Sequence, residues 1–155
     1  MLIHIDLGLA PFRGFIQERA AQIAAGRTLA PALLFYGCRD PSTDFLYHDL
    51  LSRWEKLGAI SLRCAFSRMS EQSEGCKYVQ DRLYHDRSEV IELFDAGAKL
   101  FVCGSREVGK GVEDACLRIA TEERERKKGG VVDQQKLRDW FEGLRNERFA
   151  TDVFA

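Results

Sequence analysis

The amino-acid sequence predicts an α/β fold in which a five-stranded parallel sheet lies between two layers of helices. Short apolar runs alternate with amphipathic segments along the whole chain. The apolar runs at 32–37 and 98–104 end directly in glycine and are continuous, as expected of strands buried on both faces of a parallel sheet. Such alternation forms βαβ units, which place helices on both faces of the sheet. We therefore expect one domain over residues 1–155.

The first half of the chain is expected to supply three strands and two helices. The strands are the apolar or alternating runs at 1–5, 32–37 and 59–67. One helix is predicted over 12–26, because apolar residues recur there at helical spacing: Phe12, Phe15, Ile16, Ala20 and Ile23. A second helix is predicted over 45–58. Gly26 and Gly58 supply the stops.

The second half continues the alternation. Two more strands are predicted, at 98–104 and at the C-terminus from 148 to 155. The helical segments are 77–86, 88–97, a long helix from about 108 to 127, and an amphipathic segment at 134–147. Gly129 and Gly130 end the long helix. This order of elements is that of a Rossmann-like domain.

Charge and hydropathy exclude several classes of function. The net charge of −1 argues against a general binder of nucleic acid or of anionic membranes. No apolar run approaches the roughly 20 residues that a membrane-spanning helix needs. The first residues lack a basic region followed by a long apolar stretch, so no signal peptide is expected.

The cysteines indicate a reducing compartment. The chain has five of them, an odd number, widely spaced and without a CxxC pair. We therefore predict a cytoplasmic protein with no metal site. No Ser–His–Asp set or pair of carboxylates stands out, so hydrolytic chemistry has no support.

Four loops follow the carboxyl ends of the predicted strands, at 6–11, 37–44, 67–76 and 104–109. Ligands of parallel α/β sheets bind at this edge, because the loops converge there and helices begin there. A nucleotide is the most common kind of ligand, although many such folds bind other molecules.

Five ordered motifs at these loops resemble one family. They are GLAPFRGFIQER, YGCRDPSTDFLY, FSR followed by KYVQDRL, VCG, and DVF near the C-terminus. Together they are similar to the NADPH-binding domain of diflavin reductases, such as cytochrome P-450 reductase and the reductase part of fungal fused fatty-acid hydroxylases. The resemblance covers nearly the whole chain. The flavin-binding barrel of that family has no counterpart here, which suggests that the chain begins where a larger reductase crosses into this domain.

The first loop corresponds to the family's pyrophosphate-binding turn, and the resemblance assigns Gly8 and Pro11 to it. A glycine turn lets backbone N–H groups approach the phosphates at a helix N-terminus. By resemblance, His4, Ile5, Asp6, Leu7 and Gly8 align with that turn; two of its glycines and its phosphate-contacting threonine are replaced here, and Asp6 adds a negative charge. The loop either keeps a weakened phosphate contact or is a plain strand-to-helix turn.

The second loop carries Cys38 and Arg39. In the family the arginine of this motif contacts the cofactor, and a guanidinium can bind the pyrophosphate in bidentate fashion. The alternative is a surface arginine paired with Asp40 or Asp44.

The third loop is expected to bind the 2′-phosphate of NADPH. That group needs converging cations and a hydroxyl donor, which Ser67, Arg68 and Lys77 can provide. By resemblance, Tyr78 stacks on the adenine and Gln80 contacts its edge. The family's lysine lies two residues before the tyrosine, where this chain has cysteine. If the site is real it prefers NADPH to NADH; otherwise the segment is a solvated polar loop.

The last two motifs correspond to the hydride-transfer site of the family. The resemblance places Cys103 beside the nicotinamide, Asp152 near Cys103, and Phe154 against the flavin ring. From composition alone, Cys103 is equally a buried structural cysteine, and Phe154 an ordinary packing residue at a strand end.

The resemblance therefore implies a domain that delivers hydride from NADPH to FAD, with electrons passing through FMN to a haem acceptor. FAD and FMN belong to a partner or to another domain, so the chain is expected to be inactive alone. The alternative is a non-catalytic nucleotide sensor, an interaction module, or a truncated product with impaired pyrophosphate binding.

Overall fold

Strands and helices alternate through the chain, and the computed structural model describes residues 2–5 and 9–154. The elements in chain order are β1 (Leu2–Ile5), α1 (Leu9–Ala24), β2 (Leu33–Cys38), α2 (His48–Lys56), β3 (Ser61–Phe66), the 3-10 turn η1 (Ser70–Gln72), α3 (Val79–His85), α4 (Arg87–Asp95), β4 (Leu100–Ser105), α5 (Arg106–Lys128), α6 (Gln134–Gly143) and β5 (Phe149–Phe154).

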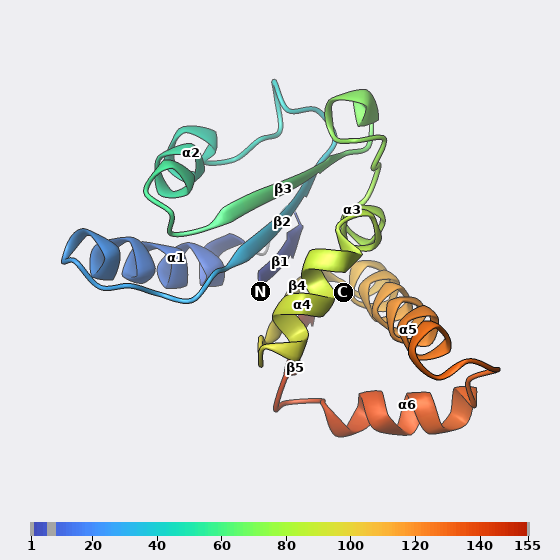
Figure 1. The fold of residues 1–155 in the computed structure, drawn as a ribbon. Helices are drawn as coiled ribbons and strands as arrows, with labels where there is room; N and C mark the ends of the chain where they lie inside the picture. Colours follow the sequence, from blue (N-terminus) through green and yellow to red (C-terminus); the bar gives the residue numbers. More distant parts are fainter. Residues whose placement is uncertain (1, 6–8, 155) are drawn as a thin grey trace.

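The strands form one sheet in the order β3-β2-β1-β4-β5, and every neighbouring pair is parallel (Figure 1). The chain winds outward from β1 to β3 and then returns to the other side of β1 with β4. The order of the strands therefore reverses between β1 and β4 at the centre of the sheet, which is where such folds bind ligands. The predicted α/β class with parallel strands is confirmed.

Helices cover both faces of the sheet. α1 and α2 lie on one face, and α3 to α6 lie on the other (Figure 1). β2 is buried along its whole length, and its side chains alternate between the two cores. Leu33 and Phe35 join the core beneath α3 and α5, while Leu34 and Tyr36 join the core beneath α1 and α2. A strand buried on both faces reads as a continuous apolar run, which explains the sequence at 32–37.

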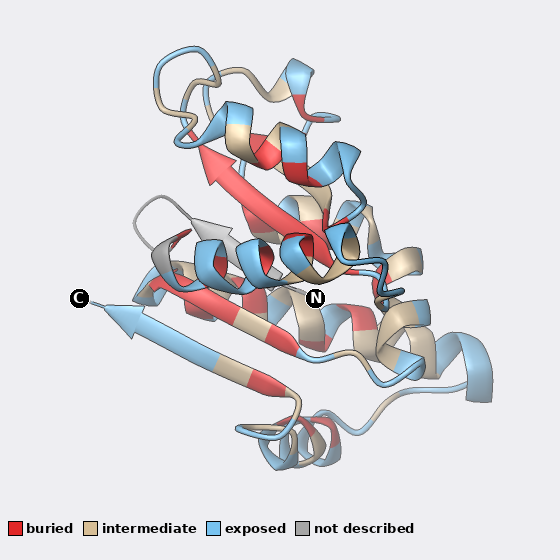
Figure 2. Cartoon of the chain, turned by 90° about the vertical axis from the view of Figure 1, so that its left-hand side faces the viewer, coloured by how far each residue is buried: buried red, intermediate tan, exposed pale blue. Residues whose placement is uncertain are grey.

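β5 forms one edge of the sheet and is buried only at its beginning. Phe149 is 2% exposed, whereas the residues from Thr151 onward are exposed (Figure 2). The apolar residues at the end of this strand are thus accessible: Val153 is 39% exposed and Phe154 is 37% exposed.

Several predicted helix ends are wrong: α1 begins at Leu9 rather than at 12, and α6 ends at Gly143 rather than at 147. Two others have clear local reasons. The helix expected from position 45 begins at His48, because the preceding segment bonds to the buried Tyr36 side chain instead of forming a helical turn. The Tyr36 hydroxyl accepts a hydrogen bond from the Leu46 N–H at 2.9 Å and donates to the Asp44 carbonyl at 3.2 Å. The long helix begins earlier than expected, at Arg106, because Ser105 caps it and accepts from the Val108 N–H at 3.4 Å.

Across the part of the chain that the structure describes, no helix is both long and apolar enough to cross a membrane.

Candidate functional site

The predicted loops after β2, β3 and β4 lie at the carboxyl ends of the strands, on the same side of the sheet, because these strands are parallel. The first loop falls partly on residues 6–8, so Gly8 and Asp6 lie outside the described residues. Pro11 lies in the first turn of α1, where its missing N–H has no helical acceptor to lose, and it is exposed to solvent.

The loops after β2 and β3 are joined by their backbones. The Ser67 N–H donates to the Cys38 carbonyl at 3.0 Å, and the Arg68 N–H donates to the Arg39 carbonyl at 2.9 Å. The parallel pairing of β2 and β3 thus continues beyond the strand ends. It brings the backbones of Arg39 and Arg68 together at the carboxyl ends of these strands, where Asp40 and Asp44 also lie.

Arg39 forms an ion pair with Asp44, one of the two neighbouring carboxylates that the sequence offers. Its Nε lies 3.1 Å from the Asp44 Oδ2, and its side chain is 62% exposed. An ion pair this exposed contributes little, so an incoming phosphate can compete for the guanidinium. Cys38, directly before it, is buried, so only its backbone faces the loop edge.

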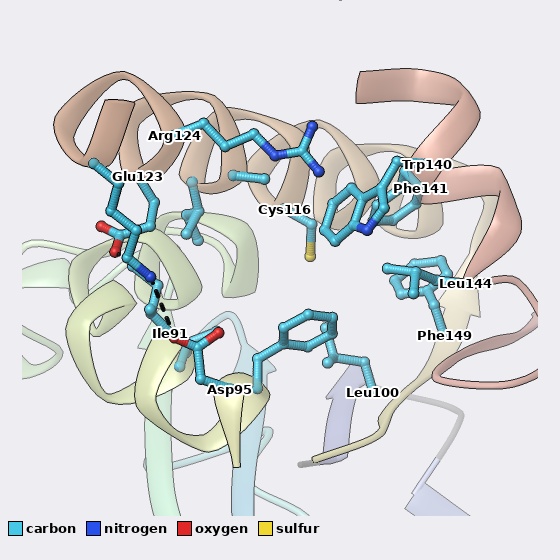
Figure 3. Close-up of a pocket in the computed structure, with 15 residues that line it drawn as sticks. Ile91, Asp95, Leu100, Cys116, Glu123, Arg124, Trp140, Phe141, Leu144 and Phe149 are labelled. Atoms are coloured by element: carbon cyan, nitrogen blue, oxygen red, sulfur yellow. Dashed lines mark hydrogen bonds and ion pairs between the residues drawn. The ribbon is translucent and has the colours of Figure 1, made fainter. Parts of the chain in front are cut away.

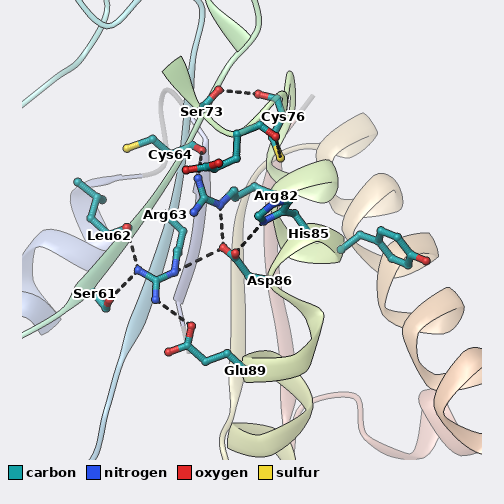
Figure 4. A network of polar contacts seen from close by, with 12 residues as sticks. Ser61, Leu62, Arg63, Cys64, Ser73, Cys76, Arg82, His85, Asp86 and Glu89 are labelled. Atoms are coloured by element: carbon teal, nitrogen blue, oxygen red, sulfur yellow. Dashed lines mark hydrogen bonds and ion pairs between the residues drawn. The ribbon is translucent and has the colours of Figure 1, made fainter. Parts of the chain in front are cut away.

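A buried serine that the sequence reasoning missed holds the third loop in place. The Ser73 hydroxyl accepts from the Phe66 N–H at 3.0 Å and donates to the Cys76 carbonyl at 2.8 Å (Figure 4). Ser73 is only 2% exposed. These bonds fold the loop back onto the end of β3, which carries Lys77 alongside Ser67. In the sequence Ser73 is only a serine close to Gly75 in a polar loop. That pattern is too common to predict a buried, hydrogen-bonded side chain.

Replacing Ser73 by alanine is expected to lower the free energy of unfolding by about 1 kcal/mol, because it removes the hydroxyl that bridges the Phe66 N–H and the Cys76 carbonyl and leaves these two groups only their direct bond of 3.3 Å. Chemical denaturation measures the change. Ser88→Ala, on the exposed surface of α4, is the matched control and should change stability by less than about 0.5 kcal/mol. Equal effects of the two substitutions would contradict the role given to Ser73.

The residues that follow Ser73 differ in exposure. Cys76 is buried, and burial raises the pKa of its thiol, which stays neutral; a thiol has no cationic form with which to replace the family's lysine. Lys77 is exposed. The Tyr78 side chain is 53% exposed, while its backbone N–H donates to the Asp81 carboxylate at 2.9 Å, at the beginning of α3. An exposed ring on a fixed backbone can stack on a base.

Gln80 lies against α5. A Cβ atom at Gly111 would lie 3.1 Å from the Gln80 Cδ, so the glycine permits this close packing. The Gln80 Oε1 is buried and has no hydrogen-bond partner among the described residues. An unpaired buried acceptor is costly, which marks this end of α3 as a position where a donor is missing.

The proposed hydride-transfer residues lie on neighbouring strands. Cys103 of β4 and Asp152 of β5 are partners in the sheet register, as are Ser105 and Phe154. Burial raises the pKa of the Cys103 thiol, and the Asp152 charge raises it further, so the thiol is neutral. The structure brings these side chains together at the carboxyl edge of the sheet; their catalytic roles remain predictions.

α3 is tied to β3 by a charged cluster that sequence reasoning also missed. Asp86 lies between two arginines, with its Oδ2 2.7 Å from the Arg82 Nε and 3.4 Å from the Arg63 Nε (Figure 4). Arg82 also donates to the Cys64 carbonyl at 3.3 Å. α3 begins directly after Tyr78, so a cluster that fixes the C-terminal end of α3 to β3 also fixes the position of the predicted nucleotide-binding segment at the other end of the helix.

Within residues 2–5 and 9–154 there is no group of three or more histidine, cysteine or acidic side chains that could hold a metal ion.

Most of this chain is similar in sequence to known proteins. Residues 7–114 match the family described as the oxidoreductase NAD-binding domain. The chain is 63% identical over 147 residues to a bifunctional cytochrome P-450/NADPH–P-450 reductase of Fusarium oxysporum, which covers 95% of this chain and 14% of that protein. It is 51% identical over 148 residues to a self-sufficient cytochrome P-450 monooxygenase of Phanerodontia chrysosporium, covering 95% of this chain and 13% of that protein.

A third relative, a bifunctional cytochrome P-450/NADPH–P-450 reductase of Acremonium egyptiacum, is 46% identical over 149 residues, covering 96% of this chain and 14% of that protein. The chain thus spans only a small part of the length of these relatives. Because the family match covers most of the chain, including the strands β2, β3 and β4, the chain belongs to the oxidoreductase NAD-binding domain family.

Proposed function

We propose that residues 1–155 form the NADP(H)-binding domain of a diflavin reductase, a Rossmann-like domain with three layers and a five-stranded parallel sheet. The observation that carries the proposal is the joining of the second and third loops through the Ser67 and Arg68 backbones. It brings the backbones of Arg39, Ser67 and Arg68 together, so two arginines and a serine start from neighbouring positions at the carboxyl ends of the strands. Lys77 reaches the same ends of the strands through the bonds of Ser73.

The residues present suit a phosphate ester of adenosine. Ser67, Arg68 and Lys77 provide a hydroxyl and two cations for a 2′-phosphate, and no acidic residue takes the ribose-reading place that NAD-specific sites use. Tyr78 offers an exposed ring for the adenine. Arg39 would donate hydrogen bonds to the pyrophosphate in place of its present ion pair with Asp44. The unpaired Gln80 Oε1 lies at the same end of α3.

The other end of the cofactor would lie at β4 and β5. Bound NADPH supplies a hydride that FAD accepts, after which electrons pass through FMN to a haem acceptor. Cys103 and Asp152, paired across the two strands, would orient the nicotinamide, and the exposed Phe154 would pack against the flavin ring. The names of the relatives, which join a cytochrome P-450 to its NADPH-dependent reductase, support this assignment.

The flavins belong to other domains or to a partner, so we propose that the chain is inactive alone. A cytoplasmic location is part of the proposal, supported by five free cysteines.

Calorimetric titration with 2′,5′-ADP tests the nucleotide site directly. We expect saturable binding, and weaker binding of 5′-AMP, because only the former carries the 2′-phosphate. An absence of binding would favour the alternative of a non-catalytic interaction module whose first loop has lost the nucleotide. In a second assay, NADPH and ferricyanide should show no turnover without added flavoprotein; robust turnover by the chain alone would overturn its proposed dependence on a flavin partner.

A further inference from the structure

A hollow lies at the amino ends of β4 and β5, on the opposite side of the sheet's length from the proposed nucleotide site. It has a volume of about 200 Å³ and lies between α4, α5 and α6 (Figure 3). Its floor includes Leu100 and Phe149, the first residues of β4 and β5. The nucleotide site uses the other ends of the same two strands, so the two sites do not share a residue.

The walls of the hollow are apolar and held in place. Phe94 and Trp140 meet edge to face with ring centroids 6.2 Å apart, and Phe141 and Phe149 lie 4.8 Å apart. The Arg148 guanidinium covers Phe94 at 3.7 Å from the ring centroid. Each of these rings is held by a neighbouring side chain, so none of them is free to rotate into the hollow and fill it. The hollow is therefore preformed.

One end of the hollow is closed by satisfied charges. Lys127 lies 3.5 Å from the Asp95 carboxylate and 3.1 Å from that of Glu123, which links α4 to α5. Glu123 is also paired with Arg126 at 2.7 Å. These groups neutralise one another and leave little attraction for a charged ligand.

The other end carries a guanidinium without a carboxylate. Arg124 lies over the Trp140 ring at 4.4 Å from its centroid (Figure 3). No carboxylate of the described chain pairs with it. A positive charge at the margin of an apolar hollow is complementary to a ligand that has an apolar body and an anionic end, since a guanidinium binds a carboxylate through two parallel hydrogen bonds.

Cys116 adds a neutral surface to the interior. In Figure 3 its sulfur is directed from α5 into the hollow. Burial raises the pKa of this thiol to about 12, so it carries no charge near neutral pH. A neutral, polarisable sulfur packs well against an aromatic ring.

We propose that this hollow binds a compact aryl-alkanoic acid, with its single ring among Phe94, Cys116 and Phe149 and its carboxylate paired with Arg124. The size supports one ring, because an apolar cavity of about 150 Å³ is sufficient for benzene. A long alkyl chain exceeds the space. The ligand would replace water against an apolar lining, which favours binding.

The experiment is a titration of 3-phenylpropionate into the 155-residue protein, followed by NMR of the backbone amides. The uncharged 3-phenylpropionamide is the matched ligand. We expect the acid to bind about tenfold more tightly than the amide, with shifts at α4, α5 and α6. Arg124→Gln should remove that preference, because it removes the charged partner. Arg138→Gln, an exposed arginine of α6 outside the lining, is the matched control and should keep it.

Cys116→Phe fills the hollow and should abolish binding of both ligands. Equal affinities for acid and amide in the wild type, or no binding at all, would overturn the proposal. Shifts confined to residues outside the three helices would also overturn it. Titration of the same samples with 2′,5′-ADP reports on the nucleotide site separately, so a failure here is distinguished from a failure of the proposed function.

Discussion

Replacing Arg68 by alanine is expected to weaken the binding of 2′,5′-ADP about 100-fold and to change the affinity for 5′-AMP by less than about threefold. In the proposed site Arg68 contacts only the 2′-phosphate. Hydrogen bonds between charged groups contribute about 1.5–3 kcal/mol each, and the loss of one bidentate contact corresponds to about two powers of ten in affinity. Isothermal titration calorimetry of both nucleotides measures the split.

The exposed position of Arg68 makes the measurement clean. Its side chain lies outside both cores, so the free energy of unfolding should change by less than about 0.5 kcal/mol. Arg53→Ala, an exposed arginine on α2, is the matched control and should leave both affinities unchanged. If Arg68→Ala weakens 5′-AMP as strongly as 2′,5′-ADP, the residue acts as a general positive charge and the assignment of the 2′-phosphate is wrong.

Raising the ionic strength provides an independent reading. Arg68 is exposed and would attract the 2′-phosphate by its charge, which salt screens. The ratio of the affinities for 2′,5′-ADP and 5′-AMP should therefore fall as salt is added. In the alanine variant that ratio is small from the start and should respond little. A salt dependence that persists unchanged in the variant would place the 2′-phosphate on another cation, of which Lys77 is the one assigned to the same site.

The class of fold was predictable because burial leaves a direct mark on sequence. β2 is enclosed on both faces and reads as an unbroken apolar run at 32–37. Element ends were less predictable. The start of α2 depends on a hydrogen bond from Leu46 to the hydroxyl of Tyr36, ten residues earlier, and no local pattern encodes such a contact.

The candidate site was predictable as a set of loops but not as a set of contacts. Parallel strands must end at a common edge, so the meeting of the second and third loops followed from the fold. The parts that hold them did not. Ser73 acts through backbone groups that no sequence pattern reveals, and Asp86 joins Arg63, an arginine that precedes it by more than 20 positions. The hollow at the amino ends of β4 and β5 likewise needs three helices that meet only in the folded chain.

Replacing Asp86 by asparagine is expected to lower the free energy of unfolding by about 2–3 kcal/mol at neutral pH. Asp86 is 13% exposed, and its two arginine partners are 22% and 14% exposed. Removing one partner of a largely buried ion pair leaves the remaining charges uncompensated, which costs about 3–5 kcal/mol when the pair is fully enclosed. Residual exposure and the second acceptor of Arg63, the Glu89 carboxylate at 2.8 Å, reduce that figure here.

The same carboxylate predicts a pH dependence. Burial raises the pKa of Asp86, but hydrogen bonds from Arg82 and His85 and the charges of Arg82 and Arg63 outweigh it, so the pKa is lowered overall. A lowered folded-state pKa means that the contribution to stability is complete above the unfolded value of about 3.9 and is lost as the pH falls through the folded value. The stability difference between wild type and Asp86→Asn should therefore be constant above about pH 5 and shrink below about pH 4.

Urea denaturation across this pH range measures the difference. Asp49→Asn is the matched control, since that carboxylate is 92% exposed and pairs only with His48 among the described residues; it should change stability by less than about 0.5 kcal/mol at any pH. A constant difference down to pH 3 would show that Asp86 acts by shape rather than by charge. Because α3 begins directly after the predicted adenine-stacking residue, Asp86→Asn should also weaken 2′,5′-ADP binding, but without altering its preference over 5′-AMP. That pattern separates a residue that positions the site from Arg68, which would contact the phosphate itself.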